Sequence, residues 1–382
     1  MINFGLNDEH VQMRSSVRAL VQDKVTPMAK DAEERHIFPR EVLPLLAGQG
    51  LLGLKYPEAL GGQGLDILAE CVLTEELTRA AAGLSAGVFA HSHLGIAPIL
   101  YFGSDELRAD FAAPALRGEQ IAGFALTEPS AGSDVKGIRT RARRSGDDYV
   151  LDGSKVFITN GTIADYLVVA AYTEPGAGSR GISIFVVPTD TPGIERRALR
   201  KLGNWSSDTA EVFFQDVTVP ARYRIGVEHG GFGQLMQILT EGRIIVSTRA
   251  LALAEQANEM ALAYAKERTA FGRPIASYQT LSHRLAATSV EVDAARMLIY
   301  RAARLYMAGQ DCAVEASKAK YYASTLAQRA TTEALHVHGG WGYMAEYEVE
   351  RLYRDAPESV IGEGTAEIQL RVIARSLGMV EV

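Results

Sequence analysis

The chain has 382 residues, of which 47% are hydrophobic and 22% charged, and its formal net charge is −7. The length suggests two or three domains or one large multi-layer unit, and the composition is typical of a soluble globular protein. The negative charge argues against binding to nucleic acid or to an anionic membrane. The two cysteines, Cys71 and Cys312, are far apart and indicate neither a disulfide framework nor a metal site. The N-terminus is not a signal sequence, and no apolar run approaches a membrane span, so we expect a cytoplasmic protein.

Residues 1–120 carry apolar side chains at helical spacing and are expected to form an all-α domain. Within it, GQGLLG at 48–53 matches the dinucleotide-binding pattern G-x-G-x-x-G. The preceding PREVLPLLA is typical of a helix rather than of the buried strand that this motif requires, so we interpret the glycines as a helix end and a turn. GLSAG at 83–87 matches the nucleophile elbow of hydrolases, with Ser85 as the nucleophile, but both flanks are helical. Small residues packed at a helix crossing are the preferred interpretation, and a hydrolase is the rival class.

Residues 121–228 are expected to form a β-barrel-like domain, because three segments rich in β-branched and aromatic residues are separated by Pro and Gly: DYLVVAAYT, GISIFVVPTD and AEVFFQDVTVP. The stretch FALTEPSAGSD at 124–134 places hydroxyls and free backbone amides in a turn that can bind a phosphate or the edge of a planar ring. The alternative is a tight turn between strands. In KVFITNG, Phe157 and Thr159 lie on the same side of a strand and suit a stacked ring system.

Residues 229–382 are expected to form an α-bundle domain. Three long segments, 231–267, 281–308 and 312–336, carry Ala, Leu and Ile at helical spacing. An alanine-rich bundle packs closely, including against copies of itself. The pair His336-x-His338 lacks further ligands nearby, and we expect no metal site.

Near the end of the chain, VIGEGTAEIQ holds a carboxylate, Glu363, between two glycines. One interpretation is a helix start, with Thr365 as the cap and Glu367 in the first turn. The other is a binding or catalytic site, because flanking glycines let the backbone approach a bulky ligand and leave the carboxylate unshielded. These residues alone leave both interpretations open.

Six blocks of the chain resemble those of the acyl-CoA dehydrogenase family, in that family's order and spacing: TEPSAGSD, KVFITNG, KLGNWSSDTAEVFF, ERTAFGRPIASYQ, HGGWGYMAEYEVERLYRDA and GEGTAEIQ. The resemblance covers essentially the whole chain, and six blocks in order are much more specific than any one of them. It implies an α+β fold with an N-terminal helical domain, a middle β-barrel-like domain and a C-terminal four-helix bundle, assembled as a homotetramer.

The resemblance also implies that FAD binds between the β domain and the bundle. The residues that it assigns to the flavin half of FAD are Phe124, Leu126, Thr127, Gly132, Ser133, Phe157 and Thr159. Those that it assigns to the pyrophosphate and adenosine, across a subunit boundary, are Arg268, Phe271, Gln279, His336, Gly339 and Gly340, with Thr365 and Glu367 where the last helix begins. The implied contacts to the thioester substrate are Ser133, Thr240, Arg243 and Gly364.

By the same resemblance Glu363 is the catalytic base, which takes the α-proton of an acyl thioester while the β-hydrogen leaves as hydride to flavin N5. The backbone amide of residue 363 and a flavin hydroxyl would stabilise the developing enolate oxygen. An apolar slot would raise the pKa of the carboxylate. Some branches of the family place the base on the bundle helix, which makes Glu241 a competitor. The matching position here is Gly242, and a helix turns residue 241 about 100° away from it, so Glu363 is favoured.

Three positions depart from the family's pattern. Gly362 stands where many relatives carry Tyr, which either opens the acyl pocket for a branched, cyclic or longer group or only loosens the turn. Thr240 replaces an Asp that helps to hold the pantetheine arm. His336 replaces a Gln at the pyrophosphate, and its ring can still donate a hydrogen bond.

The resemblance therefore predicts an FAD-dependent dehydrogenase that converts an acyl-CoA thioester to the trans-2-enoyl thioester and passes electrons to an electron-transfer flavoprotein, in fatty acid or amino acid catabolism. One alternative is the same chemistry on an acyl- or aminoacyl-carrier-protein thioester in secondary metabolism. Another is an acyl-CoA oxidase that oxygen reoxidises. A catalytically silent scaffold is disfavoured because Glu363 is present. The length and branching of the acyl group are not determined by the sequence.

Overall fold

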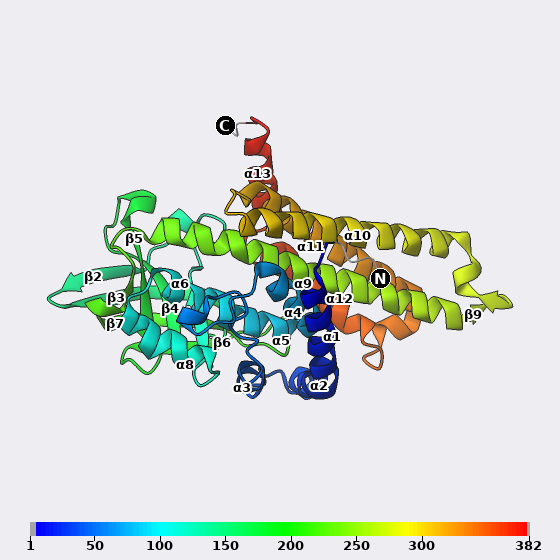
Figure 1. The fold of residues 1–382 in the computed structure, drawn as a ribbon, viewed down its shortest axis with the longest axis horizontal. Coiled ribbons are helices and arrows are strands. Elements are labelled where there is room, and N and C mark those ends of the chain that lie inside the picture. Colours follow the sequence, from blue (N-terminus) through cyan, green and yellow to red (C-terminus); the bar gives the residue numbers. More distant parts are fainter. Residues whose placement is uncertain (1–4, 380–382) are drawn as a thin grey trace.

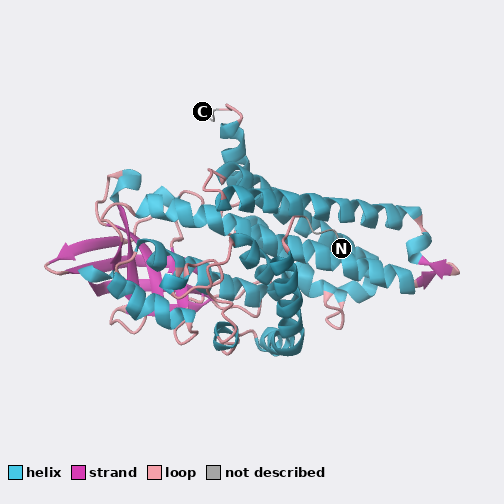
Figure 2. Ribbon diagram, in the orientation of Figure 1, coloured by secondary structure: helices cyan, strands magenta, loops and turns pink. Residues whose placement is uncertain are grey.

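Helices, a sheet and helices again follow one another along the chain, as the sequence predicts (Figures 1 and 2). The structure is a computed structural model that describes residues 5–379. Residues 1–4 and 380–382, which belong to the expected first and last domains, lie outside it. The sheet lies at one end of the long axis, and the long helices extend from it to the other end.

The N-terminal helices enclose an apolar core of their own. The first of them begins at Asn7, whose side chain accepts a hydrogen bond from the His10 N–H at 2.8 Å and so satisfies a free amide of the first turn. The helices of this part are α1 (Asp8–Leu20), α2 (Thr26–Arg35), α3 (Val42–Ala47), α4 (Ile67–Ala80), α5 (Ala82–Phe89), α6 (Ala97–Phe102), α7 (Asp105–Leu107) and α8 (Ala113–Leu116).

Both glycine motifs of this part have a structural role. The 48–53 motif follows the end of α3, and Gly50 has a φ of 71° in the turn, as a helix end requires. Ser85 is buried inside α5. A Cβ on Gly87 would overlap the ring of Phe38, so the small residues do allow close packing. Gly87 packs against Phe38, which lies in a loop, whereas the sequence predicted that the small residues pack where two helices cross.

The run Ala82–Phe102, which joins α5 and α6, is longer and more apolar than the sequence inspection indicated. Its 21 residues are helical and apolar enough to span a membrane, and 94% of the apolar window is buried inside the protein. A helix that is buried to this extent is a core helix of the protein.

Among the described residues, eight strands form one mixed sheet in the order β6-β7-β3-β2-β4-β5-β8, and β1 pairs with β4 in parallel. A single parallel bridge between Arg141 and Tyr172 joins β2 to β4. The two halves of the sheet share a core that includes Leu151 and Phe185, which gives the barrel-like arrangement. The strands are β1 (Ala122–Ala125), β2 (Arg141–Ser145), β3 (Asp148–Thr159), β4 (Tyr166–Tyr172), β5 (Ile182–Pro188), β6 (Ile194–Ala198), β7 (Thr209–Pro220) and β8 (Arg224–Ile225).

The C-terminal part is a helical bundle around α11, which packs against α9, α10, α12 and α13. Its three long helices lie close to the bounds expected from the sequence. A small hairpin joins the first two at the far end from the sheet (Figure 1). The elements are α9 (Gly231–Glu267), β9 (Thr269–Ala270), β10 (Arg273–Pro274), α10 (Gln279–Met307), α11 (Ala313–His338), α12 (Val349–Ile361) and α13 (Ala366–Ser376).

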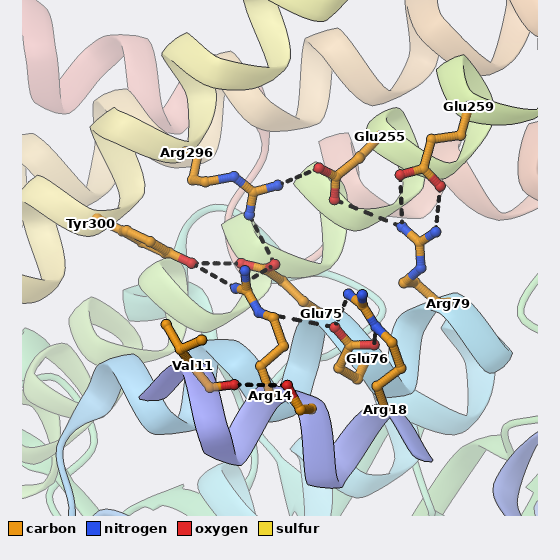
Figure 3. Close-up of polar contacts among 11 residues, drawn as sticks. Val11, Arg14, Arg18, Glu75, Glu76, Arg79, Glu255, Glu259, Arg296 and Tyr300 are labelled. Carbon is orange, nitrogen blue, oxygen red and sulfur yellow. Dashed lines mark hydrogen bonds and ion pairs between the residues drawn. The ribbon is translucent and has the colours of Figure 1, made fainter. Parts of the chain in front are cut away.

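A buried ion network fixes the N-terminal helices on the bundle (Figure 3). Glu75 of α4 accepts hydrogen bonds from Arg14 of α1 at 2.9 Å and from Arg296 of α10 at 2.8 Å. Tyr300 also donates to Glu75, at 3.0 Å. Arg18 of α1 pairs with Glu76 of α4 beside this network, and two further pairs extend it to α9: Arg296–Glu255 and Arg79–Glu259. Because an unpaired buried charge is strongly unfavourable, the network favours one placement of these helices.

The loop after β6 links all three parts of the chain close to α12. The Asn204 N–H donates to Asp355 of α12 at 2.5 Å, and the Ser206 N–H donates to Glu33 of α2 at 2.9 Å. Between them, the Trp205 ring lies 3.7 Å from the Arg354 guanidinium. This block of the sequence therefore serves as a junction that positions α12, the helix that leads to Glu363.

Candidate active site

The turn between α12 and α13 consists of Gly362, Glu363 and Gly364. Glu363 has a φ of 54° and Gly364 a φ of 89°, both in the left-handed region. A residue other than glycine rarely adopts that conformation unless its surroundings hold it there, and such residues cluster at functional sites. Thr365 then caps α13, its hydroxyl accepting from the Ile368 N–H at 3.4 Å. The stretch is thus the predicted helix start and also a turn that presents a carboxylate.

A side chain at residue 362 would have to displace the end of the Glu358 side chain. The φ of Gly362 is −66°, which is open to every residue, but a Cβ there would overlap Oε1 of Glu358. The other oxygen of Glu358 lies 3.4 Å from Nη1 of Arg249, whose guanidinium also donates to the Ala82 carbonyl at 3.0 Å. An ion pair therefore fills the space into which a side chain at 362 would project.

Glu363 faces α9. A Cβ on Gly242 would lie 3.5 Å from Glu363 Oε2 and 3.3 Å from His93 Nε2. Oε2 is buried and has no hydrogen-bond partner among residues 5–379. Burial first, and the carboxylate of Glu358 second, raise the pKa of Glu363 to about 7. Three cations nearby act in the opposite direction, Lys320, Arg243 and Arg249.

Glu241, the competing carboxylate, is fully buried in an ion pair. Its Oε1 contacts Lys55 Nζ, and its Oε2 accepts from the Tyr101 hydroxyl at 3.4 Å. Lys55 also donates to Nδ1 of His93 at 2.6 Å, and His93 Nε2 donates to the Ile238 carbonyl at 2.9 Å. Burial acts to raise the pKa of Glu241, but the charge of Lys55 together with hydrogen bonds from Lys55 and Tyr306 holds that pKa below its usual range. Glu241 is therefore the ionised partner of a buried lysine.

The predicted substrate contacts differ in where the structure places them. Arg243 of α9 is close to Glu363, and its Nε is buried without a hydrogen-bond partner in the described part of the chain. The Thr240 hydroxyl is turned back on its own helix, donating to the Met236 carbonyl at 2.8 Å. Ser133 is exposed in the loop after β1. The structure thus brings Arg243 to the carboxylate and leaves the Thr240 hydroxyl engaged elsewhere.

The residues predicted around the flavin lie on β1, on the following loop and on β3. The register of β3 shifts between Lys155 and Ile158, and Phe157 has a φ of 61° and is 67% exposed. A large aromatic ring left that open is typical of a surface that a ligand or partner covers. The remaining members divide into buried Phe124 and Leu126, half-buried Thr127 and Thr159, and exposed Gly132 and Ser133.

Most residues predicted for the pyrophosphate and adenosine lie at the opposite end of the molecule, near the hairpin of β9 and β10 (Figure 1), whereas Thr365 and Glu367 lie at the start of α13, next to the Glu363 turn. Phe271 at the tip of this hairpin is 96% exposed. A cavity of about 610 Å³ beside it is lined by residues that include Arg268, Gly339 and Gly340. The other members do not line this cavity: Gln279, His336 and Glu367 are exposed, and Thr365 is half-buried as the cap of α13.

Comparison with known proteins identifies the family. Models of the acyl-CoA dehydrogenase N-terminal, middle and C-terminal domains match residues 7–119, 123–217 and 229–378. An acyl-CoA dehydrogenase of Bacillus subtilis (strain 168) is 40% identical over 97% of this chain and 98% of its own. The chain belongs to the acyl-CoA dehydrogenase family.

Other members of the family cover the chain as completely. The structure of butyryl-CoA dehydrogenase from Megasphaera elsdenii has a TM-score of 0.94 and 37% identity, covering 98% of this chain and 100% of that one. A subunit of the caffeyl-CoA reductase–Etf complex of Acetobacterium woodii is 35% identical over 97% of this chain and 98% of its own. The predicted family and the three-part fold are thereby confirmed.

Acyl-CoA dehydrogenases are FAD-dependent flavoproteins, so this chain is an FAD-dependent oxidoreductase that acts on an acyl-CoA. Its residues fit the cofactor. The exposed rings of Phe157 and Phe271 offer apolar faces to its two aromatic systems. A Cβ on Gly132, Gly339 or Gly340 would meet no atom within 4 Å, so a ligand can approach the backbone at these three positions. Within residues 5–379, no group of three or more His, Cys, Asp or Glu side chains is placed to hold a metal ion.

Two features of this acyl-CoA dehydrogenase were not singled out by its sequence motifs. Tyr264, His338 and Trp341 line the 610 Å³ cavity, and the first two rings stack at 4.3 Å. The only sequence signal for them was their position in or near the family's blocks. His338 and not His336 is the histidine that reaches the cavity.

The second feature is a buried ion pair beneath the loop 124–134. Lys155 Nζ donates to Glu128 at 2.8 Å and to the Leu126 carbonyl at 3.0 Å. Glu128 also accepts from the backbone N–H groups of Arg139 at 2.5 Å and Thr140 at 3.0 Å. Burial lowers the pKa of Lys155 to about 8, against the opposing charge of Glu128. This pair ties the loop to β3, and the charged residues within the small and apolar blocks TEPS and KVF were its only sequence signal.

Proposed function

We propose that the protein forms the trans-2 double bond of an acyl-CoA thioester, with Glu363 as the base that removes the α-proton. The observation that carries this proposal is the state of the Glu363 carboxylate. It is held in a left-handed turn, its Oε2 is buried without a hydrogen-bond partner among the described residues, and its pKa is raised to about 7. A carboxylate with those properties accepts a proton readily near neutral pH. Glu241, in contrast, lies in a regular helix, has Lys55 against its Oε1 and has a pKa below its usual range.

The turn also offers a donor for the substrate carbonyl. Among the described residues, no acceptor contacts the backbone N–H of Glu363, and the small neighbours Gly362 and Gly364 leave it accessible. A donor placed where negative charge develops on the thioester oxygen lowers the barrier to proton removal. Arg243, whose Nε has no partner in the described part of the chain, adds positive charge beside the same group. Bound FAD supplies the acceptor for the hydride.

For the electron acceptor we propose an electron-transfer flavoprotein. The support is the relative that is a subunit of the caffeyl-CoA reductase–Etf complex. Reoxidation by oxygen is the competing outcome. It predicts that the reduced enzyme turns over in air without a protein acceptor and releases hydrogen peroxide.

We propose that the protein is a homo-oligomer, and a homotetramer in particular. The flavin-side residues and the Phe271 hairpin lie at opposite ends of the long axis, which α9, with 37 residues, spans over about 55 Å (Figure 1). One FAD cannot contact both ends of one chain, so the hairpin serves the FAD of a neighbour. In addition, α13 projects from the body with Leu370 and Leu377 exposed, which suits packing against another copy.

Anaerobic flavin bleaching tests the activity. The enzyme is mixed with straight-chain, branched and cyclic acyl-CoA thioesters, and with the same acyl groups on a carrier protein. We expect bleaching and a trans-2-enoyl-CoA product for at least one CoA thioester. Bleaching by carrier-protein thioesters alone would favour the secondary-metabolism alternative, and no bleaching by any thioester would refute the proposed reaction.

Arg268→Ala tests the shared FAD site, with Lys266→Ala as the matched control, since both side chains are exposed at the same end of α9. We expect Arg268→Ala to weaken FAD retention and subunit association together, measured by flavin absorbance and light scattering, and the control to change neither. A fully active, FAD-replete monomer would contradict the shared site.

A further inference from the structure

Lys320 is an unusual residue for its position. It lies on α11 among alanines that pack against the other helices of the bundle, and its side chain is buried. A buried ammonium group is unfavourable unless polar partners compensate it. The partner of Lys320 is the turn that carries the catalytic carboxylate: its Nζ donates to the Gly364 carbonyl at 2.6 Å.

We propose that Lys320 is a positioning residue for Glu363: by holding the Gly364 carbonyl it fixes the left-handed turn, and by its charge it favours the ionised carboxylate. This inference rests on the proposed role of Glu363 as the base. The lysine acts through the turn and does not itself contact the reacting atoms.

The geometry assigns the mechanical part of this role. Two donors converge on one carbonyl oxygen, Lys320 Nζ and Gln369 Nε2, the second at 2.9 Å. They fix the orientation of the peptide group between Gly364 and Thr365. This peptide group directly follows Glu363 and Gly364, the two consecutive residues in the left-handed conformation. An unfavourable backbone conformation persists only when its surroundings over-determine it. Because Gln369 belongs to α13 and Lys320 to α11, the two donors also tie the turn to the bundle.

Charged groups surround Glu363 from three helices. Glu358 of α12 raises its pKa, whereas Lys320 of α11 and two arginines of α9, Arg243 and Arg249, lower it. His93, which faces the same point beside Gly242, stays neutral because burial lowers its pKa to about 4. Lys320 therefore opposes the effects of burial and of Glu358 and keeps the carboxylate available as a base near neutral pH.

The ammonium group of Lys320 loses its proton more readily than that of an exposed lysine. Burial lowers the pKa of its ammonium to about 8, although Glu358 and Glu363 act to raise it. Lys320 is thus protonated in the pH range in which Glu363 loses its proton, at about 7. The charge that favours the base is present when the base must ionise, and it is lost at more alkaline pH.

The first test is the pH dependence of flavin reduction, measured by anaerobic stopped flow with the best acyl-CoA of the panel. The variants are Lys320→Met, Lys320→Arg and Glu358→Gln, with Lys318→Met as the control, since Lys318 is on the same helix but half exposed. We expect Lys320→Met to raise the midpoint of the profile by about one pH unit, because an opposite charge is lost. We also expect its maximal rate to fall by about tenfold or more, because the turn is loosened.

The other variants separate the effect of the Lys320 charge from the effect of its side-chain shape. Lys320→Arg should restore most of the midpoint, and Glu358→Gln should shift it to lower pH, opposite in sign to Lys320→Met. The control should leave both midpoint and rate unchanged. If Lys320→Met lowers the rate but leaves the pH midpoint unchanged, Lys320 has only a structural role. If Lys320→Met matches the control in both rate and midpoint, Lys320 has no role in the reaction. Either result overturns the proposal.

A second test does not depend on turnover. Thermal unfolding of the FAD-loaded enzyme is compared for the parent, Lys320→Met, Glu363→Gln and the double variant, at pH 7.5 and pH 5. At pH 7.5 we expect Lys320→Met to lower the midpoint more in the parent than in the Glu363→Gln background, because only the ionised carboxylate interacts with the ammonium. At pH 5, where Glu363 is protonated, this difference should shrink. Equal shifts in both backgrounds at pH 7.5 would refute the charge interaction. If no thioester bleaches the parent, the proposed reaction fails while this cycle still decides the role of Lys320.

Discussion

Glu241 lies on α9 next to Gly242, the residue that Glu363 faces, but the two carboxylates differ in their partners. Glu241 has Lys55 against one oxygen and the Tyr101 hydroxyl at 3.4 Å from the other, and its pKa lies below the usual range. Glu363 has a buried oxygen without a hydrogen-bond partner among the described residues, and its pKa is about 7. Burial alone therefore does not make a carboxylate basic. A directly paired cation supported by hydrogen bonds reverses the effect of burial, whereas cations without such bonds to the carboxylate only moderate it.

The backbone adds a second difference between the two. Glu241 lies within a regular helix, where its conformation needs no support from elsewhere. Glu363 has a φ of 54° and depends on the contacts of Lys320 and Gln369 to the next carbonyl. The carboxylate that we propose as the base is thus the one that the rest of the fold must hold in place. The following predictions test this contrast between a paired and an unpaired carboxylate.

The largest effect is expected for Glu363→Gln. A neutral amide cannot take the α-proton, so flavin reduction by the best acyl-CoA should fall by about a thousandfold or more while the protein stays yellow and binds product. Anaerobic stopped flow measures the rate, and flavin absorbance confirms the FAD content. A variant that reduces flavin as fast as the parent would show that the assigned base is wrong.

Moving the carboxylate should recover part of that loss. In the double variant Glu363→Gly with Gly242→Glu, the new side chain starts 3.5 Å from the place of the old Oε2. We expect a rate about tenfold or more above that of Glu363→Gly alone, because both positions face the same α-carbon. His93 must yield slightly, since its Nε2 lies 3.3 Å from the new Cβ. No recovery, with FAD bound, would place the two positions at different parts of the substrate.

Glu241→Gln should act on stability and not on rate. Removing one member of a buried ion pair leaves Lys55 without its counter-ion, which we expect to lower the free energy of unfolding by about 3 kcal/mol. Flavin reduction per bound FAD should change less than about twofold. Chemical denaturation and stopped flow measure the two effects. A large loss of rate in a stable, FAD-replete Glu241→Gln enzyme would make Glu241 part of the chemistry.

Gly362→Ala tests the ion pair that fills the space beside the base. The new methyl group must displace the Glu358 carboxylate from Arg249, and we expect a loss of about 1 kcal/mol in the free energy of unfolding. In a Glu358→Ala background the same substitution should be nearly neutral, because the space is then free. Equal losses in both backgrounds would show that something other than Glu358 excludes a side chain at residue 362.

The smallest effect is a dependence of stability on pH. The folded pKa of Glu363 is about 7, against an ordinary value of 4.5. Between these values the folded chain binds more protons than the unfolded chain, so this group makes the protein less stable as pH rises. Glu363→Gln removes that effect and should raise the thermal midpoint by a few degrees at pH 8 and by clearly less at pH 5. A gain that is the same at both pH values would contradict the raised pKa.

Much of the fold was predictable because its signals are local. The three long bundle helices followed from the spacing of Ala, Leu and Ile, and β4, β5 and β7 followed from runs of β-branched residues bounded by Pro and Gly. The blocks that resemble the acyl-CoA dehydrogenases also singled out Glu363, because a motif of consecutive residues survives in the sequence whatever the fold does around it.

What the sequence could not supply are contacts between residues far apart in the chain. The sequence by itself determined the family, the order of helical and sheet-rich parts and the carboxylate of the GEG turn, all of which depend on neighbouring residues. Only the tertiary structure decided that Glu358 fills the space beside Gly362, that Lys55 neutralises Glu241 and that Lys320 reaches the Gly364 carbonyl from 44 positions away. The physical reason is that a pKa and a strained turn depend on burial and on the charges within a few ångströms, and these are set when separate helices pack together.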